Sequence, residues 1–411
     1  MPEEWVNKRV KDLLSLNTEG IKPELHKHIS FHHFSLPAYD AGATASLEFG
    51  SEIKSNKTLI RKPSVLLSKL NPHKPRIWNI KEVPSDSVCS TEFLNLEPKP
   101  TLHQDFGYHY LLSNLFTDEM LLRLTGSTNS HKRVRPNDVM NIPINLPPLP
   151  EQKKIASILT SVDEAIAKTK AIIDQTKKLK KGMMQELLTR GIGHTRFKQT
   201  EIGEIPESWD VVTLGELANV KGGKRVPKGE SLLDEETPFP YIRIVDFKNG
   251  SISMENMKYL SENIHSKIKR YTISRTDLYI SVAGALLGLV GEVPKELDGA
   301  NLTENANKIM IKDISQTDIK FLKQLLWSDL CQNQISVHKG VGGGVPKLAL
   351  FRIQALKLTF PPLEEQKKIS IILENMDKQI YRLKDILLKH QKLKSGLMNE
   401  LLNGKVRVKN V

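Results

Sequence analysis

Cysteine is scarce in this sequence of 411 residues, and the two that occur, Cys89 and Cys331, lie far apart and outside any CxxC pair. The scarcity excludes a disulfide framework and a cysteine-based zinc site, and it favours a reducing compartment. No apolar run reaches the roughly 18 residues that a membrane span needs. The opening residues, MPEEWVNKRV, lack the apolar core of a secretory signal. We therefore expect a cytoplasmic protein without a membrane partner.

Catalytic motifs are also missing. No GxxxxGK[ST] phosphate loop occurs, and KGVGGGVPK at Lys339–Lys347 has the wrong spacing for one. No GxGxxG follows a clear strand, and the GxSxG and HExxH motifs are absent. The Pro-Pro pairs lie in LPPL and FPPL, unlike the Asn/Asp-Pro-Pro-aromatic loop of amino-methyltransferases. The sequence therefore predicts no catalytic residues and no bound cofactor.

Histidine is concentrated in one stretch, HKHISFHH, which contains His26, His28, His32 and His33. Metal binding is one interpretation, but no acidic or cysteine partner stands nearby at ligand spacing. We favour surface and core histidines in a loop-rich region, and we predict no metal site.

Basic residues are in excess, and the excess is uneven. The formal net charge is +13, which points to a polyanionic partner. Residues 1–146 carry +2 and residues 199–360 carry 0, whereas residues 147–198 carry +6 and residues 361–411 carry +5. Solvated helix surfaces account for such charge equally well. Charge alone therefore leaves nucleic-acid binding open.

One phrase occurs twice. PPLPEQKKI opens Pro147–Leu188 and PPLEEQKKI opens Pro361–Leu402, and these segments agree at 22 of 42 positions without a gap. A shorter match relates Pro2–Trp5 to Pro206–Trp209. The sequence therefore predicts a tandem duplication in the order globule, helix, globule, helix.

Both repeated segments have the apolar spacing of a long helix. Steps of three and four residues connect Ile155, Leu159, Val162 and Ile166 in one copy, and Ile369, Leu373, Met376 and Ile380 in the other. Such a seam is typical of helix-on-helix packing, as in a coiled coil. Pro-Pro ahead of each helix stops regular structure from running backward, and Glu151 and Glu365 in the first turns complement the helix dipole.

The remaining regions are predicted to be mixed α and β. We predict strands at Ser64–Ser68, Arg76–Ile80, Tyr241–Val245, Asp277–Val282 and Lys308–Ile311, and a helix near Asp318–Leu330. Glycine and proline after the first helix indicate a linker. The predicted segments are residues 1–146, a first domain; 147–190, a first helix; 191–205, the linker; 206–360, a second domain; 361–404, a second helix; and 405–411, a basic tail.

Loops with glycine, basic and amide side chains are the remaining functional candidates. Glycine lets backbone N–H groups approach phosphates, Arg and Lys read guanine edges, and Asn reads adenine. Any one such loop is more often a plain turn, so only the whole set indicates DNA contact. The predicted contacts are Lys57, Lys69, Asn71, Arg76 and Arg133 in the first domain, and Lys224, Arg225, Arg243, Asn301, Asn305 and Lys339 in the second.

The duplicated arrangement resembles the specificity subunit of type I restriction–modification systems. The two PPLxEQKKI phrases are the most specific signal. Other stretches that look like this family are SFHHFSLPAYDAG from Ser30, STEFLNLEP from Ser90, TGSTNSHKRV from Thr125, YIRIVDF from Tyr241 and LDGANLTENANKI from Leu297. The resemblance covers nearly the whole chain.

The resemblance implies an α+β fold with an internal pseudo-two-fold repeat, in which two mixed α/β target recognition domains are separated by two long antiparallel helices packed as a coiled coil. It implies that each domain binds one half of an asymmetric bipartite target in double-stranded DNA. The helices would act as a ruler and dock two methyltransferase (modification) subunits. S-adenosylmethionine is then expected on the methyltransferase subunits and ATP on the motor-nuclease (restriction) subunits. This chain would be a non-catalytic recognition subunit.

Two other hypotheses stay open. Heptads and duplication also permit a coiled-coil scaffold that binds only proteins and never touches DNA. A self-contained restriction enzyme or methyltransferase would need a nucleotide or S-adenosylmethionine loop, which the sequence does not contain.

Overall fold

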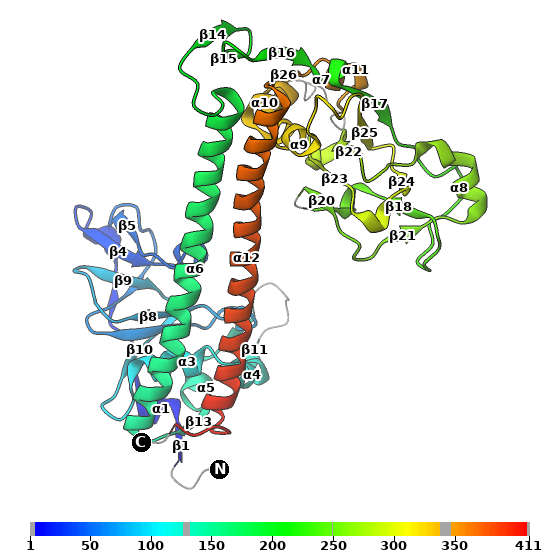
Figure 1. Cartoon of the computed structure of the whole chain (residues 1–411). Helices are drawn as coiled ribbons and strands as arrows, with labels where there is room; N and C mark the ends of the chain where they lie inside the picture. Colours follow the sequence, from blue (N-terminus) through cyan, green and yellow to red (C-terminus); the bar gives the residue numbers. More distant parts are fainter. Residues whose placement is uncertain (1–4, 126–131, 249, 338–346, 409–411) are drawn as a thin grey trace. The chain divides into compact units, whose positions relative to one another are not determined.

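The computed structural model describes residues 5–125, 132–248, 250–337 and 347–408, and it divides the chain into two compact units (Figure 1). The first unit comprises residues 1–171 and 384–411, and the second comprises residues 172–383. Each unit therefore contains one globule together with one end of each long helix. In the described part of the chain, no helix is both long and apolar enough to cross a bilayer.

The two predicted long helices are confirmed. Helix α6 (Leu149–Thr189) has 41 residues and helix α12 (Leu363–Leu402) has 40. Each begins directly after its Pro-Pro pair and, at 1.5 Å per residue, is roughly 60 Å long. Figure 1 shows the two helices side by side within each unit.

Two ion pairs together show that the helices run antiparallel, because the residue further along α6 pairs with the residue that comes earlier in α12. In the first unit, Lys394 Nζ donates to Asp163 Oδ1 at 2.6 Å, and in the second, Lys180 Nζ donates to Asp377 Oδ1 at 2.6 Å. Asp163 aligns with Asp377 in the repeat, and Lys180 aligns with Lys394. The two ion pairs are therefore the same contact made twice, as a pseudo-two-fold repeat requires.

The described part of the first globule is built around two larger sheets. An antiparallel sheet has the order β2 (Leu14–Asn17), β10 (Phe93–Pro98), β7 (Ser64–Ser68), β8 (Ile77–Ile80). A mixed sheet has the order β3 (Gly20–Ile21), β6 (Lys57–Leu59), β9 (Ser87–Ser90), β4 (Ser30–Phe34), β5 (Ser46–Phe49). The remaining elements are α1 (Val10–Leu13), α2 (Leu36–Asp40), α3 (Gln104–Leu111), α4 (Asn114–Leu122), α5 (Pro136–Met140), and the paired strands β1 (Val6–Arg9) with β13 (Pro143–Leu146) and β11 (Leu124–Thr125) with β12 (Arg133–Val134).

The second globule repeats this plan. Its antiparallel sheet has the order β17 (Ala218–Gly222), β25 (Ala306–Ile311), β22 (Leu278–Ser281), β23 (Val290–Glu292), and its smaller sheet has the order β21 (Lys258–Tyr259), β18 (Pro240–Ile242), β24 (Asn301–Leu302). The helices are α7 (Leu214–Leu217), α8 (Glu262–Ile268), α9 (Ile319–Trp327), α10 (Asp329–Val337) and α11 (Leu350–Gln354). The paired strands are β14 (Phe197–Thr200) with β15 (Gly203–Pro206), β16 (Asp210–Thr213) with β26 (Lys357–Phe360), and β19 (Phe247–Lys248) with β20 (Ser251–Ile252).

The apolar core of each unit extends from its globule onto the helix ends. Ile155 and Leu159 of α6 pack with Leu401 and Leu402 of α12 in the first unit's core. In the second unit, Leu188 of α6 packs with Ile369 and Leu373 of α12. Since the globule and the helix ends share one core, each unit is held together by continuous burial.

The repeated phrase anchors each globule to its helix. Trp5 Nε1 donates to Glu151 Oε2 at 3.2 Å, and Trp209 Nε1 donates to Glu365 Oε2 at 2.9 Å. The following residue of the phrase also bonds to the globule, since Gln152 Oε1 accepts from His103 N at 2.8 Å and Gln366 Oε1 accepts from Asp318 N at 2.9 Å. The nine-residue phrase therefore recurs because both globules dock through the same polar contacts.

Most of the predicted local structure is confirmed, with two corrections. The predicted strand Tyr241–Val245 ends at Ile242, because Arg243 and Asp246 cap the 3-10 turn Ile244–Asp246. The predicted helix Asp318–Leu330 breaks at Ser328, whose extended backbone ends α9 and whose Oγ donates to Leu325 O at 2.6 Å. Ser113 separates α3 from α4 with the same contact, its Oγ donating to Tyr110 O at 2.6 Å.

Candidate nucleic-acid interface

Three of the predicted contacts in the first globule lie at one end of the β7–β8 hairpin. Leu70 forms a bridge pair with Arg133, so the segment that starts at Lys69 runs against β12. Asn71 N donates to Lys132 O at 2.8 Å, and Val134 N donates to Lys69 O at 3.0 Å. Asn71 has a φ of +52°, which asparagine tolerates better than most residues. The hairpin and β12 therefore bring Lys69, Asn71 and Arg133 together.

The arginines of this region are paired with carboxylates. Arg133 donates through Nε and Nη2 to Glu92 at 3.2 and 3.0 Å. Arg76 donates through Nε and Nη2 to Asp40 at 2.7 and 2.9 Å, and the hydrogen bond from Arg76 holds the pKa of Asp40 below its ordinary value. Both guanidinium groups are thus held in a two-point geometry that also suits phosphate or a guanine edge.

Lys57 lies elsewhere, in β6, and its side chain is buried. Its Nζ donates to Ser55 Oγ at 2.5 Å, and burial lowers its pKa. In this conformation the ammonium group is directed into the fold and is not presented at the surface.

Three predicted contacts of the second globule gather around the segment Thr303–Asn305. Lys224 N donates to Leu302 O at 2.8 Å, and Arg225 Nε donates to Glu304 Oε1 at 2.7 Å. The backbone before Lys224 lies so close to the Leu302–Thr303 segment that residue 223 has to be glycine. A Cβ on Gly223 would lie 2.1 Å from Thr303 O. Lys224 and Arg225 are exposed and Asn305 is half-buried.

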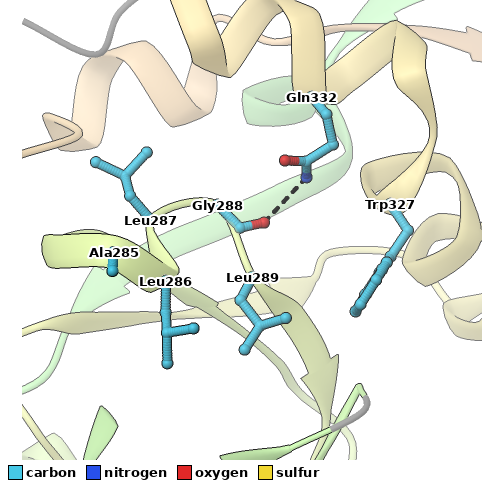
Figure 2. A pocket seen from close by; sticks show the side chains of 7 residues that line it. All are labelled: Ala285, Leu286, Leu287, Gly288, Leu289, Trp327 and Gln332. Atoms are coloured by element: carbon cyan, nitrogen blue, oxygen red, sulfur yellow. Dashed lines mark hydrogen bonds between the residues drawn. The ribbon is translucent and has the colours of Figure 1, made fainter. Parts of the chain in front are cut away.

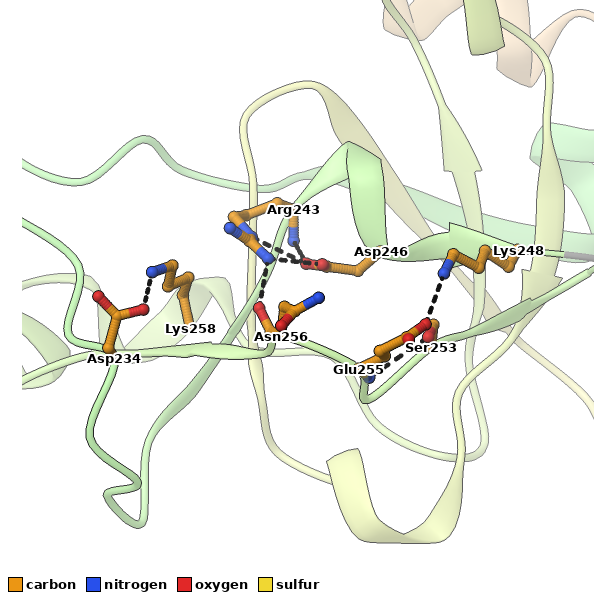
Figure 3. A network of polar contacts seen from close by, with 8 residues as sticks. All are labelled: Asp234, Arg243, Asp246, Lys248, Ser253, Glu255, Asn256 and Lys258. Carbon is orange, nitrogen blue, oxygen red and sulfur yellow. Dashed lines mark hydrogen bonds and ion pairs between the residues drawn. The ribbon is translucent and has the colours of Figure 1, made fainter. Parts of the chain in front are cut away.

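Arg243 belongs to a polar network (Figure 3). It follows Ile242, whose carbonyl accepts from Thr303 N at 3.1 Å. Arg243 Nη2 donates to Asp246 Oδ1 at 2.8 Å and to Asn256 O at 2.7 Å. Lys248 donates to Glu255 at 3.1 Å in the same view, and Lys258 is paired with Asp234. Arg243 is therefore paired with a carboxylate, as Arg76 and Arg133 are in the first globule.

The remaining two predicted residues differ from the rest. Asn301 is fully buried: its Nδ2 donates to Ile268 O at 2.9 Å and its Oδ1 lies 2.7 Å from His265 Nδ1. Its amide is therefore committed to the fold and is not presented to a ligand. Lys339 lies outside the described residues.

Sequence reasoning missed Lys347. Ala283 forms a bridge pair with Lys347, and Leu348 N donates to Val282 O at 2.9 Å. These contacts repeat those of Leu70 with Arg133 in the first globule, so Lys347 occupies the position of Arg133. Lys347 is exposed. The bridge joins segments far apart in the chain, so no local pattern marked the equivalence.

Comparison with known proteins accounts for the repeat. A family model described as the type I restriction modification DNA specificity domain matches residues 2–178 and again residues 206–389. The chain belongs to this family. The chain is thus a specificity subunit with two family domains, and it serves in recognition rather than catalysis.

Relatives in the specificity family match over the full chain. The type I restriction enzyme MjaVIII specificity subunit of Methanocaldococcus jannaschii is 28% identical over 420 residues, which cover 100% of this chain and 95% of that protein. Among solved structures, a chain from work on complex assembly and conformational transition of the type I restriction–modification system has a TM-score of 0.63 at 18% identity, covering 99% of both chains. The type I S subunit from M. genitalium has a TM-score of 0.58 at 17% identity, covering 99% of this chain and 97% of that one. The expected fold class of the specificity family is confirmed.

A pocket of about 370 Å³ lies at the tip of the β22–β23 hairpin (Figure 2). It is lined by Ala285, Leu286, Leu287, Gly288, Leu289, Trp327 and Gln332. Gln332 Nε2 donates to Gly288 O at 3.0 Å and ties the hairpin tip to α10. None of the seven lining residues is ionisable, so the pocket offers no acid or base.

The histidine-rich stretch of this specificity-family chain is divided between a turn and a strand. His26 and His28 are exposed in the turn before β4, and His32 and His33 lie in β4. His33 Nδ1 lies 3.1 Å from Glu48 Oε2, and burial lowers the pKa of His33. His32 Nδ1 lies 3.0 Å from Ser85 O. Within the described ranges, no three His, Cys, Asp or Glu side chains are grouped in a way that could hold a metal ion.

Proposed function

We propose that this chain confers an asymmetric, bipartite DNA specificity, with one half-site for each globule. The observation that supports this most directly is the repeated junction between a hairpin and a returning segment, Leu70 with Arg133 and Ala283 with Lys347. The junctions match in backbone contacts but carry different side chains around them. Two domains of equivalent build and different surface chemistry suit two different half-sites.

The helices serve in this proposal as a ruler. Each helix runs through both units, and each unit holds its helix ends in antiparallel register with one Asp–Lys pair. A helix that keeps its length resists compression better than a loop does, so the number of residues in α6 and α12 would set the gap between half-sites.

The helices also offer surfaces for two methyltransferase subunits. Leu179 and Leu393 are exposed at equivalent positions, and so are Ile172 and Ile386. Apolar side chains that recur at equivalent exposed positions suit two copies of one partner. We place S-adenosylmethionine on those methyltransferase subunits and ATP on motor-nuclease subunits of the complex, which would act in the cytoplasm.

The test is to co-express the chain with its neighbouring methyltransferase in a methylation-free host and to map methylated adenines across the genome. A split, asymmetric motif with a fixed gap is the expected result. If no motif appeared while the same methyltransferase was active beside another specificity chain, the proposal would fail and a protein-binding scaffold would be the better description.

A further inference from the structure

Each globule has an exposed arginine–glutamate pair close to its junction, although the two pairs are not equivalent positions of the repeat. Arg133 itself forms the bridge with Leu70, whereas Glu304 precedes Asn305, whose carbonyl accepts from Val282 N at 2.8 Å beside Ala283. In the first globule, 44% of the Arg133 side chain and 27% of the Glu92 side chain are exposed. In the second, 77% of the Arg225 side chain is exposed against 25% for Glu304. In each pair the carboxylate is the more buried partner and the guanidinium the more exposed one.

Glu304 is itself held in place. Thr303 Oγ1 lies 3.0 Å from Glu304 Oε2, while Arg225 Nε donates to Glu304 Oε1 at 2.7 Å. Burial opposes ionisation of Glu304, but the hydrogen bonds from Arg225, its own backbone and Thr303 lower its pKa below the ordinary value. The carboxylate is therefore charged at neutral pH and fixes the Nε edge of Arg225.

Stability alone gives little reason for such pairs, because exposed ion pairs contribute roughly 0–1 kcal/mol. Near DNA they have two other effects. An adjacent carboxylate cancels the charge that would attract any phosphate, and it restricts a flexible guanidinium to a few orientations.

We propose that Glu92 and Glu304 are specificity-determining positioning residues, which hold Arg133 and Arg225 for the correct half-site and weaken their attraction to other DNA. This inference rests on the proposed function and deepens it. The pairing agrees with the near-neutral charge of the globules, +2 for residues 1–146 and 0 for residues 199–360, because each pair adds no net charge. Paired charges make no net contribution, whereas the uncompensated basic charge lies in the helical segments.

The experiment uses the complex of the full chain with its methyltransferase and begins from the motif that the wild-type complex methylates. Binding is measured by salt titration on two duplexes of equal length, one with the motif and one with both half-sites scrambled. For Glu304→Gln we expect tighter binding to the scrambled duplex, with a salt slope steeper by about 0.9 for one added phosphate contact. The ratio of specific to non-specific affinity should fall about tenfold.

The chain offers matched controls. Glu204 pairs with Arg190 at 2.9 Å on β15, and Glu19 pairs with Arg61 through both carboxylate oxygens in the first globule. Glu204→Gln and Glu19→Gln remove the same charge from similar exposed pairs and should leave the specificity ratio unchanged. The double variant Arg225→Gln/Glu304→Gln keeps the wild-type net charge, so it should lose specific affinity without gaining non-specific affinity.

The methylation map supplies a second readout that a merely structural role would not change. Glu304→Gln should loosen the sequence requirement at one half-site only, and Glu92→Gln should loosen it only at the other. If both variants matched their controls in ratio and motif, the positioning role would be overturned while the proposed function stood. If the wild-type complex methylated no split motif, the proposed function itself would fail.

Discussion

His109 in the first unit stands where Gln324 stands in the second. Both project from a globule toward the aspartate of the helix ion pair. His109 Nδ1 lies 3.9 Å from Asp163 Oδ2, and Gln324 Nε2 donates to Asp377 Oδ2 at 3.1 Å. His109 also makes a contact of 3.1 Å between its Nε2 and Thr160 Oγ1. An ionisable side chain therefore bonds to α6 through Thr160 and approaches the aspartate without a hydrogen bond in the first unit, whereas a neutral amide bonds to the aspartate directly in the second.

A second difference concerns the glutamate that binds each tryptophan. Glu151 accepts from Arg407 Nε at 2.9 Å and Nη2 at 2.8 Å, whereas Glu365 lies 2.8 Å from His194 Nε2. The C-terminal tail thus does in the first unit what the linker after α6 does in the second. The residues that keep the geometry of the repeat, Trp, Glu, Gln, Asp and Lys, are identical in both units. The additional side chains that contact them differ between the units. The two units should therefore fold alike and respond differently to pH and truncation.

The largest expected effect comes from the buried tryptophan of the second unit. Trp209 is fully buried, so Trp209→Ala should destabilise that unit by about 3–5 kcal/mol through cavity formation and loss of the bond to Glu365. Hydrogen exchange resolved by peptide should show the loss in residues 206–360 and not in residues 5–125. Equal loss of protection in both would show that the units unfold together and would break the comparison.

The next effect is a dependence on pH that comes from the buried His109 of the first unit and has no counterpart at the equivalent Gln324 of the second. Burial lowers the pKa of His109 from 6.5 to about 4. Between these two pH values the unfolded chain binds the proton more readily than the folded chain does. The free energy of unfolding therefore has its full value above pH 6.5 and falls by up to about 3 kcal/mol as the pH drops toward 4. Denaturant unfolding of His109→Gln at pH 7 and pH 5 should lack this component.

The reciprocal substitution sharpens the same test. Gln324→His should add a similar loss between pH 7 and pH 5 to the second unit, provided that the new imidazole is buried as His109 is. An unchanged pH profile in both swapped variants would contradict the assignment of the effect to this position.

A smaller effect is expected from the tail. Removing residues 405–411 takes Arg407 and the Val408 N–H from Glu151 and should cost the first unit about 2 kcal/mol. Thermal unfolding of the truncated chain at pH 7 measures the loss. Arg407→Lys is the conservative control, because it keeps the charge and loses the two-point geometry, so it should fall between wild type and truncation.

The smallest effect on stability is expected from lengthening both helices between their ion pairs. Four residues inserted after Ala171 and four after Leu383 leave Asp163–Lys394 and Lys180–Asp377 within their own units. The proposed ruler would lengthen by roughly 6 Å, which corresponds to about two base pairs. Methylation mapping should then show a wider gap between unchanged half-sites. A changed half-site with the old gap would contradict the ruler.

Local patterns predicted local structure well. The strand Ser64–Ser68 and both long helices were visible because apolar periodicity and Pro-Pro boundaries act within a few residues. The break at Ser328 was missed because the apolar spacing continues across it, and only the cap contact ends the helix.

The candidate site was harder to predict. Arg133 and Glu92 are 41 positions apart, and Arg225 and Glu304 are 79 apart, so no window of sequence joins them. Asn301 carries an amide, the kind of side chain that reads adenine, yet the fold buries it.

The sequence by itself determined the duplication, the long helices, the absence of catalytic motifs and the family of this chain, because these depend on residue identity and short-range spacing. Only the tertiary structure decided which residues pair. Asp163 and Lys394 meet because two antiparallel helices fold back on each other, and Lys347 matches Arg133 because separate segments form the same bridge. Contacts between distant residues depend on chain topology, which burial of the shared cores stabilises and which no local propensity specifies.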